Sequence, residues 1–387
     1  MKKILAVTGI RSEYDILYPV LKELEQNNFE VKLVVSNAHL SDWHGNTFSK
    51  IEDDGFKVAD KIDCLFMTNR KTQRVKGVGI LTYALSQTVE RENPDFLLVI
   101  GDREESIASA LVGNYMDVLT AHLGGGDPVF GNADDPIRFA VSKLAHIHLT
   151  TAKQYSKNLL KVGEEKFRIF NVGNPALDNI RNTRKIKIES LSKEIGFDIN
   201  DKKYVVLIKH PLSSEKEEAF NQMEVTLKAL KIFHDKTGFN VVASYPNTDP
   251  GSYDIIDAIK LYENESFIKF FKTLPRELFI NIIKNSKALV GNSSMGILEA
   301  PFYKLPVVNV GNRQKGRLNA GNVEFVKHNV NEITRALSKA CFDKNYRDYI
   351  AKLQNPFGNG NSAKKILKVF NKINLNDSKW YIKKRLC

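Results

Sequence analysis

The sequence of 387 residues has few cysteines and no long apolar run, and both absences restrict what the protein can be. Its three cysteines, Cys64, Cys341 and Cys387, are far apart and lack the spacing of a metal site. A disulfide framework is therefore excluded, and a reducing, cytoplasmic location is expected. No segment approaches the roughly 20 apolar residues that span a bilayer, so we expect no membrane association. The start at Met1 leads into a short apolar stretch, which indicates a first strand and not a signal peptide.

The sequence also lacks low-complexity segments and internal repeats, which excludes solenoid and disordered classes. Its hydrophobic fraction of 42% and charged fraction of 26% are those of a globular protein. A chain of this length exceeds what one hydrophobic core usually supports, so two domains of roughly 150 to 200 residues are expected.

Net charge is the one compositional excess, at +12. Nucleic-acid binding would require clustered lysines and arginines. Here the lysines are scattered over many expected helices, are densest between Lys364 and Arg385, and form no basic repeat interleaved with aromatic residues. We therefore expect no nucleic-acid partner and interpret the charge as a solvated surface with a bias toward diphosphate ligands.

Short apolar runs alternate with longer amphipathic stretches, which predicts an α/β fold of two doubly wound, Rossmann-like lobes facing a cleft. The expected domains are residues 1–180, residues 181–357, and a closing helix with a basic tail at 358–387. A polar connector is expected at about 179–202, and the closing helix is expected to pack back on the first lobe. The expected strands lie near 4–8, 30–36, 96–101, 118–123, 147–151 and 167–172, then near 204–209, 241–245, 267–271, 288–290 and 307–310.

In the first lobe, charged residues follow two expected strands at the point where each strand ends. Arg11 lies at the start of an expected helix, where backbone N–H groups and the helix dipole favour binding of an anion. Asp102 and Arg103 follow the strand near 96–101, so that a carboxylate and a guanidinium emerge together. Asp102 is a candidate base or sugar ligand, and Arg103 offers a planar fork to diphosphate oxygens. A solvated Arg11 and a helix cap by Asp102 are the structural alternatives.

The segment 121–138 is the most unusual in the chain, because a glycine triplet at 124–126 follows a strand and several acids lie close behind. The glycines expose backbone to an approaching ligand. Asp127 and Asp134 are candidate catalytic acids on this loop. Capping of the helix that runs to Leu144 accounts for one acid of the pair at 134 and 135, and we expect at least one other acid to be catalytic.

The second lobe carries polar residues after three expected strands and a basic loop after a fourth. Serine hydroxyls and N–H groups at a helix start suit a phosphate, and a carboxylate one turn later can accept both ribose hydroxyls. A plain serine cap and solvated arginines are the structural alternatives. The candidate nucleotide-binding residues are Arg11 of the first lobe and His210, Asn247, Asp249, Ser293, Ser294, Glu299 and Arg313 of the second.

Six short motifs, each present once, are distributed along the chain: GDR at 101–103, DD-x-IR at 134–138, SKLAH at 142–146, HP at 210–211, GNSS-x-G at 291–296 and GNRQ-x-GR at 311–317. Together they resemble the hydrolysing UDP-N-acetylglucosamine 2-epimerases that open sialic and legionaminic acid synthesis. The resemblance implies a pair of lobes similar to GT-B glycosyltransferases and release of UDP and N-acetylmannosamine with no metal or nicotinamide. It also implies a homodimer or homotetramer.

Carried over by position, the resemblance assigns roles to most of the candidates. It implies that Asp102 and Asp134 are catalytic acids and that Arg103 lies near the diphosphate. The residues implied to hold the nucleotide are Arg11, His210, Asn247, Ser293, Ser294, Glu299 and Arg313.

Several positions depart from the family pattern H-x-E-G-G-E. The place of its first, essential glutamate is Gly124, and that of the second is Asp127. Asp127 is the expected substitute because it lies on the same glycine loop. Asp15 replaces a family serine, and Phe139 replaces a family histidine. These changes indicate an altered sugar, such as a 6-deoxy, 4-acetamido one.

The expected reaction is elimination of the nucleoside diphosphate followed by hydration, which inverts C2 and releases a free sugar. The same reaction on UDP-2,4-diacetamido-2,4,6-trideoxyglucose is one alternative. A non-hydrolysing 2-epimerase would return intact UDP-sugar, and a GT-B glycosyltransferase would require an acceptor. A module that binds a sugar nucleotide without turnover, through loss of the glutamate at Gly124, is a further alternative.

Overall fold

The computed structural model describes residues 1–66, 72–129, 134–247 and 249–382, and the chain divides into two compact units. Unit 1 comprises Met1–Pro128, Ala133–Arg181 and Phe357–Cys387. Unit 2 comprises Val129–Asn132 and Asn182–Pro356. The chain thus returns to unit 1 after completing unit 2.

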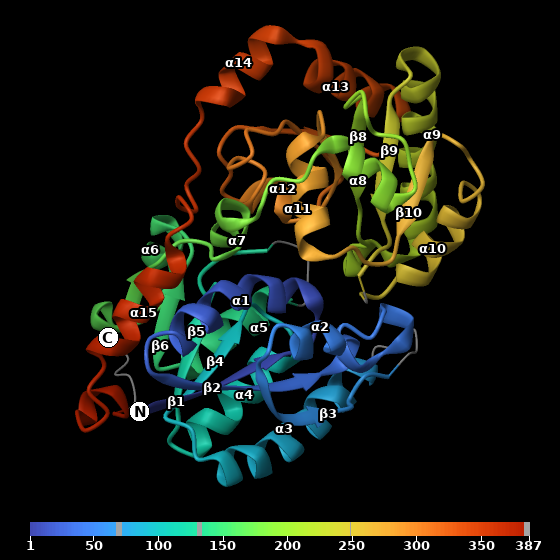
Figure 1. The fold of residues 1–387 in the computed structure, drawn as a ribbon. Coiled ribbons are helices and arrows are strands. Elements are labelled where there is room, and N and C mark those ends of the chain that lie inside the picture. The colour runs from blue at the N-terminus through green and yellow to red at the C-terminus, as the bar shows by residue number, and fades with distance from the viewer. Residues whose placement is uncertain (67–71, 130–133, 248, 383–387) are drawn as a thin grey trace. The chain divides into compact units, whose positions relative to one another are not determined.

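Unit 1 is built on a seven-stranded parallel sheet with the order β3-β2-β1-β4-β5-β6-β7 (Figure 1). The direction of winding reverses between β1 and β4, and such a switch point is where doubly wound sheets bind ligands. The strands are β1 Lys2–Thr8, β2 Phe29–Ser36, β3 Lys57–Ile62, β4 Phe96–Ile100, β5 Leu119–Leu123, β6 Ile147–Thr150 and β7 Ile169–Asn171.

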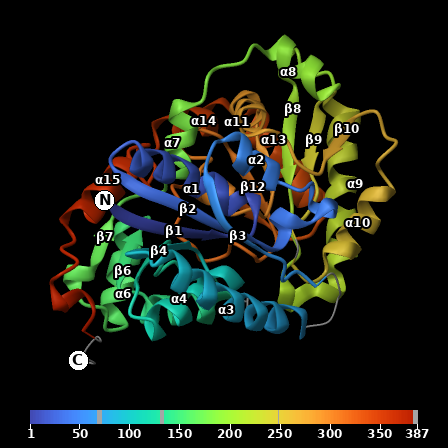
Figure 2. The ribbon, with the colours of Figure 1, turned by 60° about the horizontal axis from the view of Figure 1, so that its bottom comes forward.

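Helices cover both faces of this sheet, as the two views of the ribbon show (Figures 1 and 2). On one face, residues of α1 and α15 pack on the strands, and on the other, residues of α3, α4 and α5 do so. The α-helices of unit 1 are α1 Arg11–Glu25, α2 Phe48–Asp53, α3 Thr72–Glu92, α4 Glu104–Tyr115, α5 Asp134–Leu144, α6 Lys153–Lys161, α7 Ala176–Asn182 and α15 Ser362–Lys372.

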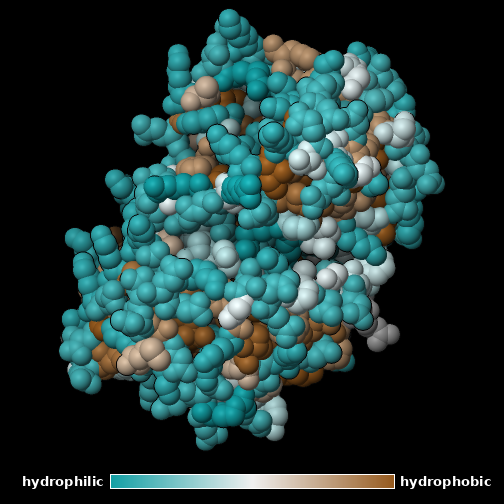
Figure 3. All heavy atoms as spheres, viewed as in Figure 1, coloured by the Kyte–Doolittle hydropathy of each residue, from teal (hydrophilic) through white to brown (hydrophobic). Residues whose placement is uncertain are grey.

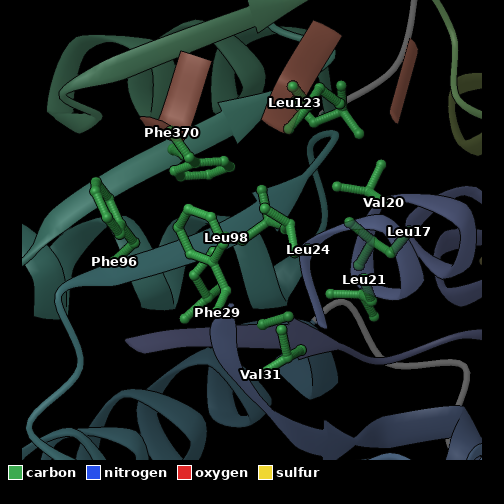
Figure 4. Close-up of a cluster of buried hydrophobic side chains, with 14 of the residues drawn as sticks. Leu17, Val20, Leu21, Leu24, Phe29, Val31, Phe96, Leu98, Leu123 and Phe370 are labelled. Atoms are coloured by element: carbon green, nitrogen blue, oxygen red, sulfur yellow. The ribbon is translucent and has the colours of Figure 1, made fainter. Parts of the chain in front are cut away.

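The C-terminal helix α15 belongs to unit 1 and confirms the expectation that it packs back on the first lobe. Its Phe370 is fully buried and lies among side chains from α1, β2 and β4 (Figure 4). The rings of Phe370 and Phe96 meet edge to face, with centroids 4.9 Å apart. At the start of α15, the carboxylate of Asp178 accepts the backbone N–H groups of Ser362 at 3.0 Å and Ala363 at 3.1 Å. A residue of α7 thus caps a helix that follows it by 184 positions.

Unit 2 repeats the scheme with a six-stranded parallel sheet of order β10-β9-β8-β11-β12-β13. The strands are β8 Tyr204–Ile208, β9 Asn240–Ser244, β10 Ile268–Phe271, β11 Leu289–Gly291, β12 Val307–Val310 and β13 Val323–Val326. The α-helices are α8 Ile188–Ile195, α9 Ala219–Thr237, α10 Ser252–Lys260, α11 Arg276–Asn285, α12 Met295–Leu298, α13 Val330–Phe342 and α14 Lys344–Lys352.

Two separate apolar layers cover the faces of the unit 2 sheet. One contains α9, α10 and α13, and the other contains α8 and α11. The predicted connector at 179–202 is therefore wrong in part, because α8 lies within it and buries Leu191 and Ile195 in the second layer.

On the face drawn in Figure 3, hydrophilic residues predominate.

Candidate active site

The loops after β1 and β4 lie at the switch point of the unit 1 sheet and carry the first predicted site residues. Arg11 is the first residue of α1, and the N-cap residue Ile10 provides no side-chain hydrogen bond to the helix. Asp102 and Arg103 lie between β4 and α4, and the N-cap residue of α4 is Arg103. The alternative interpretation of Asp102 as a helix cap is therefore not supported.

Asp102 is held by Arg138 of α5. Nη2 of Arg138 donates to Oδ2 of Asp102, and Nη1 donates to the carbonyl oxygen of Gly124 at 2.8 Å. Both side chains are largely buried, with exposed fractions of 11% for Arg138 and 16% for Asp102. A guanidinium that spans two acceptors fixes the orientation of the carboxylate. The pair thereby places Asp102 beside the glycine loop that follows β5.

Two of the three glycines after β5 are closely packed within unit 1. A Cβ on Gly125 would lie 2.7 Å from Oγ of Ser142, and one on Gly126 would lie 2.5 Å from the carbonyl oxygen of Tyr155. Gly124 and Gly126 also have positive φ angles of 86° and 79°. Neighbouring atoms of the same unit therefore restrict positions 125 and 126 to small residues, and the ligand approach inferred from the sequence stays a prediction.

The two remaining candidate acids, Asp127 and Asp134, lie on either side of residues 130–133, which lie outside the described residues. Asp127 is buried, with an exposed fraction of 4%, and Asn158 of α6 donates to the preceding carbonyl oxygen of Gly126 at 2.9 Å. Asp134 is the first residue of α5, and its side chain lies outside the described residues. The predicted helix end at Leu144 is confirmed.

Arg11 contacts one of the residues that depart from the family pattern. Its Nε lies 3.3 Å from Oδ2 of Asp15, one turn along α1. Nδ2 of Asn179 in α7 donates to the backbone carbonyl oxygen of Asp15. A serine at this position would carry no charge, so Asp15 changes the electrostatic environment of Arg11.

Three buried glutamates at the same loops were not among the predicted site residues. Glu13 lies in the first turn of α1, and Glu104 and Glu105 lie in the first turn of α4. Burial opposes ionisation of Glu104, but Arg103 and Arg74 hold its pKa below the usual value. Burial raises the pKa of Glu13 and of Glu105, and the charge of a neighbouring glutamate raises each further.

In unit 2, Asn292 joins two loops that carry predicted nucleotide-binding residues. Its Oδ1 accepts the backbone N–H of His210 at 2.8 Å, and its Nδ2 donates to the carbonyl oxygen of His210 at 2.8 Å. Its own carbonyl oxygen accepts Nη1 of Arg313 at 3.3 Å and Nε2 of Gln314 at 2.9 Å. Asn292 was quoted within a motif but was not a predicted site residue, and the structure makes it the centre of this half-site.

Asn247 and Asp249 lie in the same network. The backbone N–H of Asn247 donates to Nδ1 of His210 at 3.1 Å, and its Nδ2 donates to Oδ2 of Asp249 at 2.6 Å. Nη2 of Arg313 lies 3.7 Å from the same oxygen of Asp249. The structure therefore brings His210, Asn247, Asp249 and Arg313 together at the carboxyl ends of the unit 2 strands.

The short helix α12 is a single turn of four residues, flanked by Ser293 and Ser294 at its start and by Glu299 at its end. Ser294 is its N-cap residue, and Oγ of Ser293 accepts the backbone N–H of Met295 at 3.3 Å. Glu299 is the C-cap residue. The helix start predicted after β11 is thus present. The hydroxyl of Ser293, not that of the N-cap residue Ser294, accepts a backbone N–H of its first turn.

Lys209 precedes His210 and is almost fully buried, with an exposed fraction of 1%. Its Nζ donates to Oγ1 of Thr226 in α9 at 3.1 Å. Burial lowers the pKa of Lys209 to about 7, and the charge of Glu215 acts weakly in the opposite direction. Strand periodicity alone could not reveal this buried amine, because a lysine at a strand end is normally solvated.

Within the described residues, no group of three or more histidine, cysteine or acidic side chains is arranged to hold a metal ion. None of the described helices combines the length and apolar character needed to cross a membrane.

Comparison with known proteins gives relatives over almost the full length. The family model described as UDP-N-acetylglucosamine 2-epimerase matches residues 22–371. The chain is 31% identical over 376 residues to a hydrolysing UDP-N,N'-diacetylbacillosamine 2-epimerase of Legionella pneumophila, which covers 97% of each chain. It is 31% identical over 341 residues to a hydrolysing GDP/UDP-N,N'-diacetylbacillosamine 2-epimerase of Campylobacter jejuni, which covers 87% of each.

Solved structures share the fold at lower identity. The UDP-N-acetylglucosamine 2-epimerase of Neisseria meningitidis bound to UDP-N-acetylglucosamine has a TM-score of 0.78 at 20% identity, over 96% of this chain and 100% of that one. These matches confirm the resemblance inferred from the motifs and the prediction of two Rossmann-like α/β lobes. The chain therefore belongs to the UDP-N-acetylglucosamine 2-epimerase family and is an enzyme of that family.

Proposed function

We propose that the protein is a hydrolysing 2-epimerase that converts a UDP-N-acetylglucosamine-type sugar nucleotide and water to UDP and a free N-acetylmannosamine-type sugar. Its activity as a UDP-sugar 2-epimerase follows from the family, and the hydrolysing course is the finer proposal. The observation that carries it is the Asp102 carboxylate, oriented by Arg138 beside the glycine loop.

The first step is elimination. The C2 hydrogen of an acetamido sugar is weakly acidic, so departure of UDP from C1 leads and builds positive charge on the ring. Arginine side chains, oriented by neighbouring groups, offset the charge that develops on the leaving diphosphate. Arg313, held by Asn292 and Asp249, fits this task in unit 2, and Arg11 and Arg103 fit it in unit 1.

Carboxylates then move the protons. One takes the C2 proton as the C1–O bond to UDP breaks, which leaves a glycal. Water adds its oxygen to C1, and a second carboxyl delivers a proton to C2 on the opposite ring face, which inverts that centre. We assign these tasks to Asp102, Asp127 and Asp134, with Asp127 in place of the family glutamate missing at Gly124.

A diacetamido-trideoxy sugar nucleotide is the second candidate substrate. The relatives from Legionella and Campylobacter are named for UDP-N,N'-diacetylbacillosamine, and the Neisseria relative, 30% identical, is named for UDP-N-acetylglucosamine. Asp15 and Phe139, which depart from the family pattern, favour an altered sugar. The ion pair of Asp15 with Arg11 supports this alternative, because it introduces a charge where the family has a hydroxyl. The reaction would then serve legionaminic rather than sialic acid synthesis.

We propose a reducing, cytoplasmic setting for the reaction. The thiols of Cys64 and Cys341 are buried and form no disulfide, which supports this location. A homodimer or homotetramer, no cofactor and no nucleic-acid partner complete the proposal.

Two substrates tested side by side decide the function. Purified protein is incubated with UDP-N-acetylglucosamine and with UDP-2,4-diacetamido-2,4,6-trideoxyglucose, and free UDP is measured by a coupled assay. The proposal expects UDP from at least one, with a manno-configured free sugar identified by proton NMR in the absence of acceptor. Epimerised but intact UDP-sugar would instead establish a non-hydrolysing enzyme, and binding without turnover would establish a binding module.

A further inference from the structure

Two glutamates at the switch point of unit 1 have no role in the proposed reaction, although both are buried. Glu13 of α1 has an exposed fraction of 7%, and Glu105 of α4 has one of 2%. Buried carboxylates are normally paired with a cation or fully hydrogen-bonded. Neither Glu13 nor Glu105 forms an ion pair with a described residue, whereas the adjacent Glu104 pairs with Arg74 and lies 3.9 Å from Nε of Arg103.

Both carboxyl groups pack against Gly9, in the loop between β1 and α1. The backbone N–H of Gly9 donates to Oε2 of Glu13 at 3.3 Å. A Cβ on Gly9 would lie 1.5 Å from Oε1 of Glu105, so the carboxyl of Glu105 occupies the space that any side chain at this position would need. In this conformation the carboxyl of Glu105 leaves no room for a side chain at position 9.

Glu105 also contacts the end of β2. Its Oε1 accepts Oγ of Ser36 at 3.3 Å and Nδ2 of Asn37. Its Oε2 is buried and has no hydrogen-bond partner among the described residues. An ionised carboxylate would leave this oxygen without compensation, while a protonated one places only a neutral group there.

We propose that Glu13 and Glu105 share one proton at neutral pH, and that this pair positions the two loops carrying the candidate catalytic residues of unit 1. One loop joins β1 to Arg11, and the other joins β4 to α4 and carries Asp102. Two carboxyls that both pack against one glycine repel each other when both are ionised, so the protonated pair is the form that holds the loops together. The positioning role rests on the proposed function, but the shared proton does not.

The surroundings of the pair carry charges of both signs. Burial raises the pKa of both carboxyls, and Arg103 acts in the opposite direction without overcoming it. The charged or titratable groups that face the pair from neighbouring elements are Asp102 and Arg103 before α4, Glu104 on α4, Arg74 on α3, His39 in the 3-10 helix Asn37–Leu40, and Asp63 and Cys64 after β3.

The shared proton is tested by stability, independently of activity. A carboxyl whose folded-state pKa is raised stabilises the fold below its unfolded value, and this stability is lost as pH rises through the folded value. Urea unfolding of the wild type, Glu13→Gln and Glu105→Gln is compared from pH 5 to pH 9, with exposed Glu90→Gln on α3 as the control. As pH rises, the urea midpoint of each buried variant is expected to increase relative to that of the wild type. The difference in urea midpoint between the Glu90→Gln control and the wild type is expected to stay constant.

A spectroscopic signature supplements this test. The infrared C=O stretch of a protonated carboxyl is expected in the wild type at pH 7.5 and is expected to be absent from the double variant Glu13→Gln/Glu105→Gln, which lacks both carboxyls. A pH-independent loss of stability in both glutamine variants, with no such band, would overturn the shared proton.

The positioning role is tested by the rate of UDP release. Glu105→Gln keeps the shape and neutrality of the protonated group, so its rate of UDP release is expected within about threefold of the wild type near pH 6.5. The pH above which this rate falls is expected to be higher in the variant than in the wild type. Glu105→Ala is expected to lose at least about tenfold, in line with the loss of one buried hydrogen-bonding group. Equal rates and equal pH profiles in all three proteins would contradict positioning. A wild type that releases no UDP would refute the proposed function and leave the stability test intact.

Discussion

Arg138 donates to the carboxylate of Asp102 across 36 positions of sequence, and with its other nitrogen it binds the carbonyl oxygen of Gly124. One guanidinium thus connects the loops after β4 and β5 at the edge of the unit 1 sheet. This arrangement fixes the orientation of the Asp102 carboxylate through side-chain and backbone contacts within unit 1.

Replacement of either partner is expected to reduce turnover. Asp102→Asn keeps the shape but cannot accept a proton, so kcat for UDP release should fall by about 10² to 10⁴. Arg138→Lys keeps the charge but loses the fork that spans both acceptors, so a smaller loss of about tenfold to a hundredfold is expected. Steady-state kinetics measures both, and an Asp102→Asn enzyme with unchanged kcat would remove Asp102 from the mechanism.

Asp127 is expected to replace the glutamate that the family has at the position of Gly124. Asp127→Asn should lower kcat by about 10² or more with little change in the affinity for UDP. Asp117→Asn, on the exposed turn after α4, is the matched control, since asparagine accepts its positive φ of 53°. Full turnover by Asp127→Asn would exclude Asp127 as an acid or base and would leave Asp102 and Asp134 as the candidates.

Asn292 is expected to control the affinity for UDP. Asn292→Ala removes the two side-chain bonds to the His210 backbone and keeps the carbonyl oxygen that accepts Arg313, and about 1 to 3 kcal/mol is typical for buried groups left unpaired. We expect the Kd for UDP, measured by calorimetry, to rise by about tenfold to a hundredfold. Asn221→Ala, at an exposed position of α9, should not change it. An unchanged Kd in Asn292→Ala would show that the two loops keep their positions without this side chain.

Lys209 is expected to make stability depend on pH. Because burial lowers its pKa in the folded state to about 7, the folded protein releases a proton that the unfolded chain holds up to about pH 10.4. Stability should therefore rise between these values, by at most about 1.4 kcal/mol per pH unit from this group.

The check is urea unfolding of Lys209→Met between pH 6 and pH 9. The variant lacks the buried ammonium, so its advantage over the wild type should be largest near pH 6 and should shrink as pH rises. Lys236→Met, at the exposed end of α9, provides the control. A difference that stays constant over this range would show that Lys209 does not titrate there.

Much of the fold followed from the periodicity of apolar residues. The run Tyr204–Ile208 is buried at every position and was predicted as a strand because no polar residue interrupts it. The edge strands β3 and β13 were missed, because KVADKI and VEFV are short and mostly not buried, and half of KVADKI is charged. The other two edge strands, β7 and β10, were predicted, so an edge position alone does not hide a strand.

The site was predictable only in part. The positions of Asp102 and Arg313 followed from the rule that loops after parallel strands meet at one sheet edge. The partners of these residues did not follow, because Arg138 and Asn292 lie far away in sequence and act through tertiary contacts. The burial of Glu13, Glu105 and Lys209 was not predictable either, since charged side chains are normally solvated and only packing shows the exceptions.

The most direct test of elimination and hydration is the reaction in deuterium oxide, followed by NMR. The account predicts one UDP released per sugar, and a free manno-configured product that carries deuterium at C2, with both signals reduced together in Asp102→Asn. A product that retains its original hydrogen at C2, or deuterium in an intact UDP-sugar without free UDP, would contradict it.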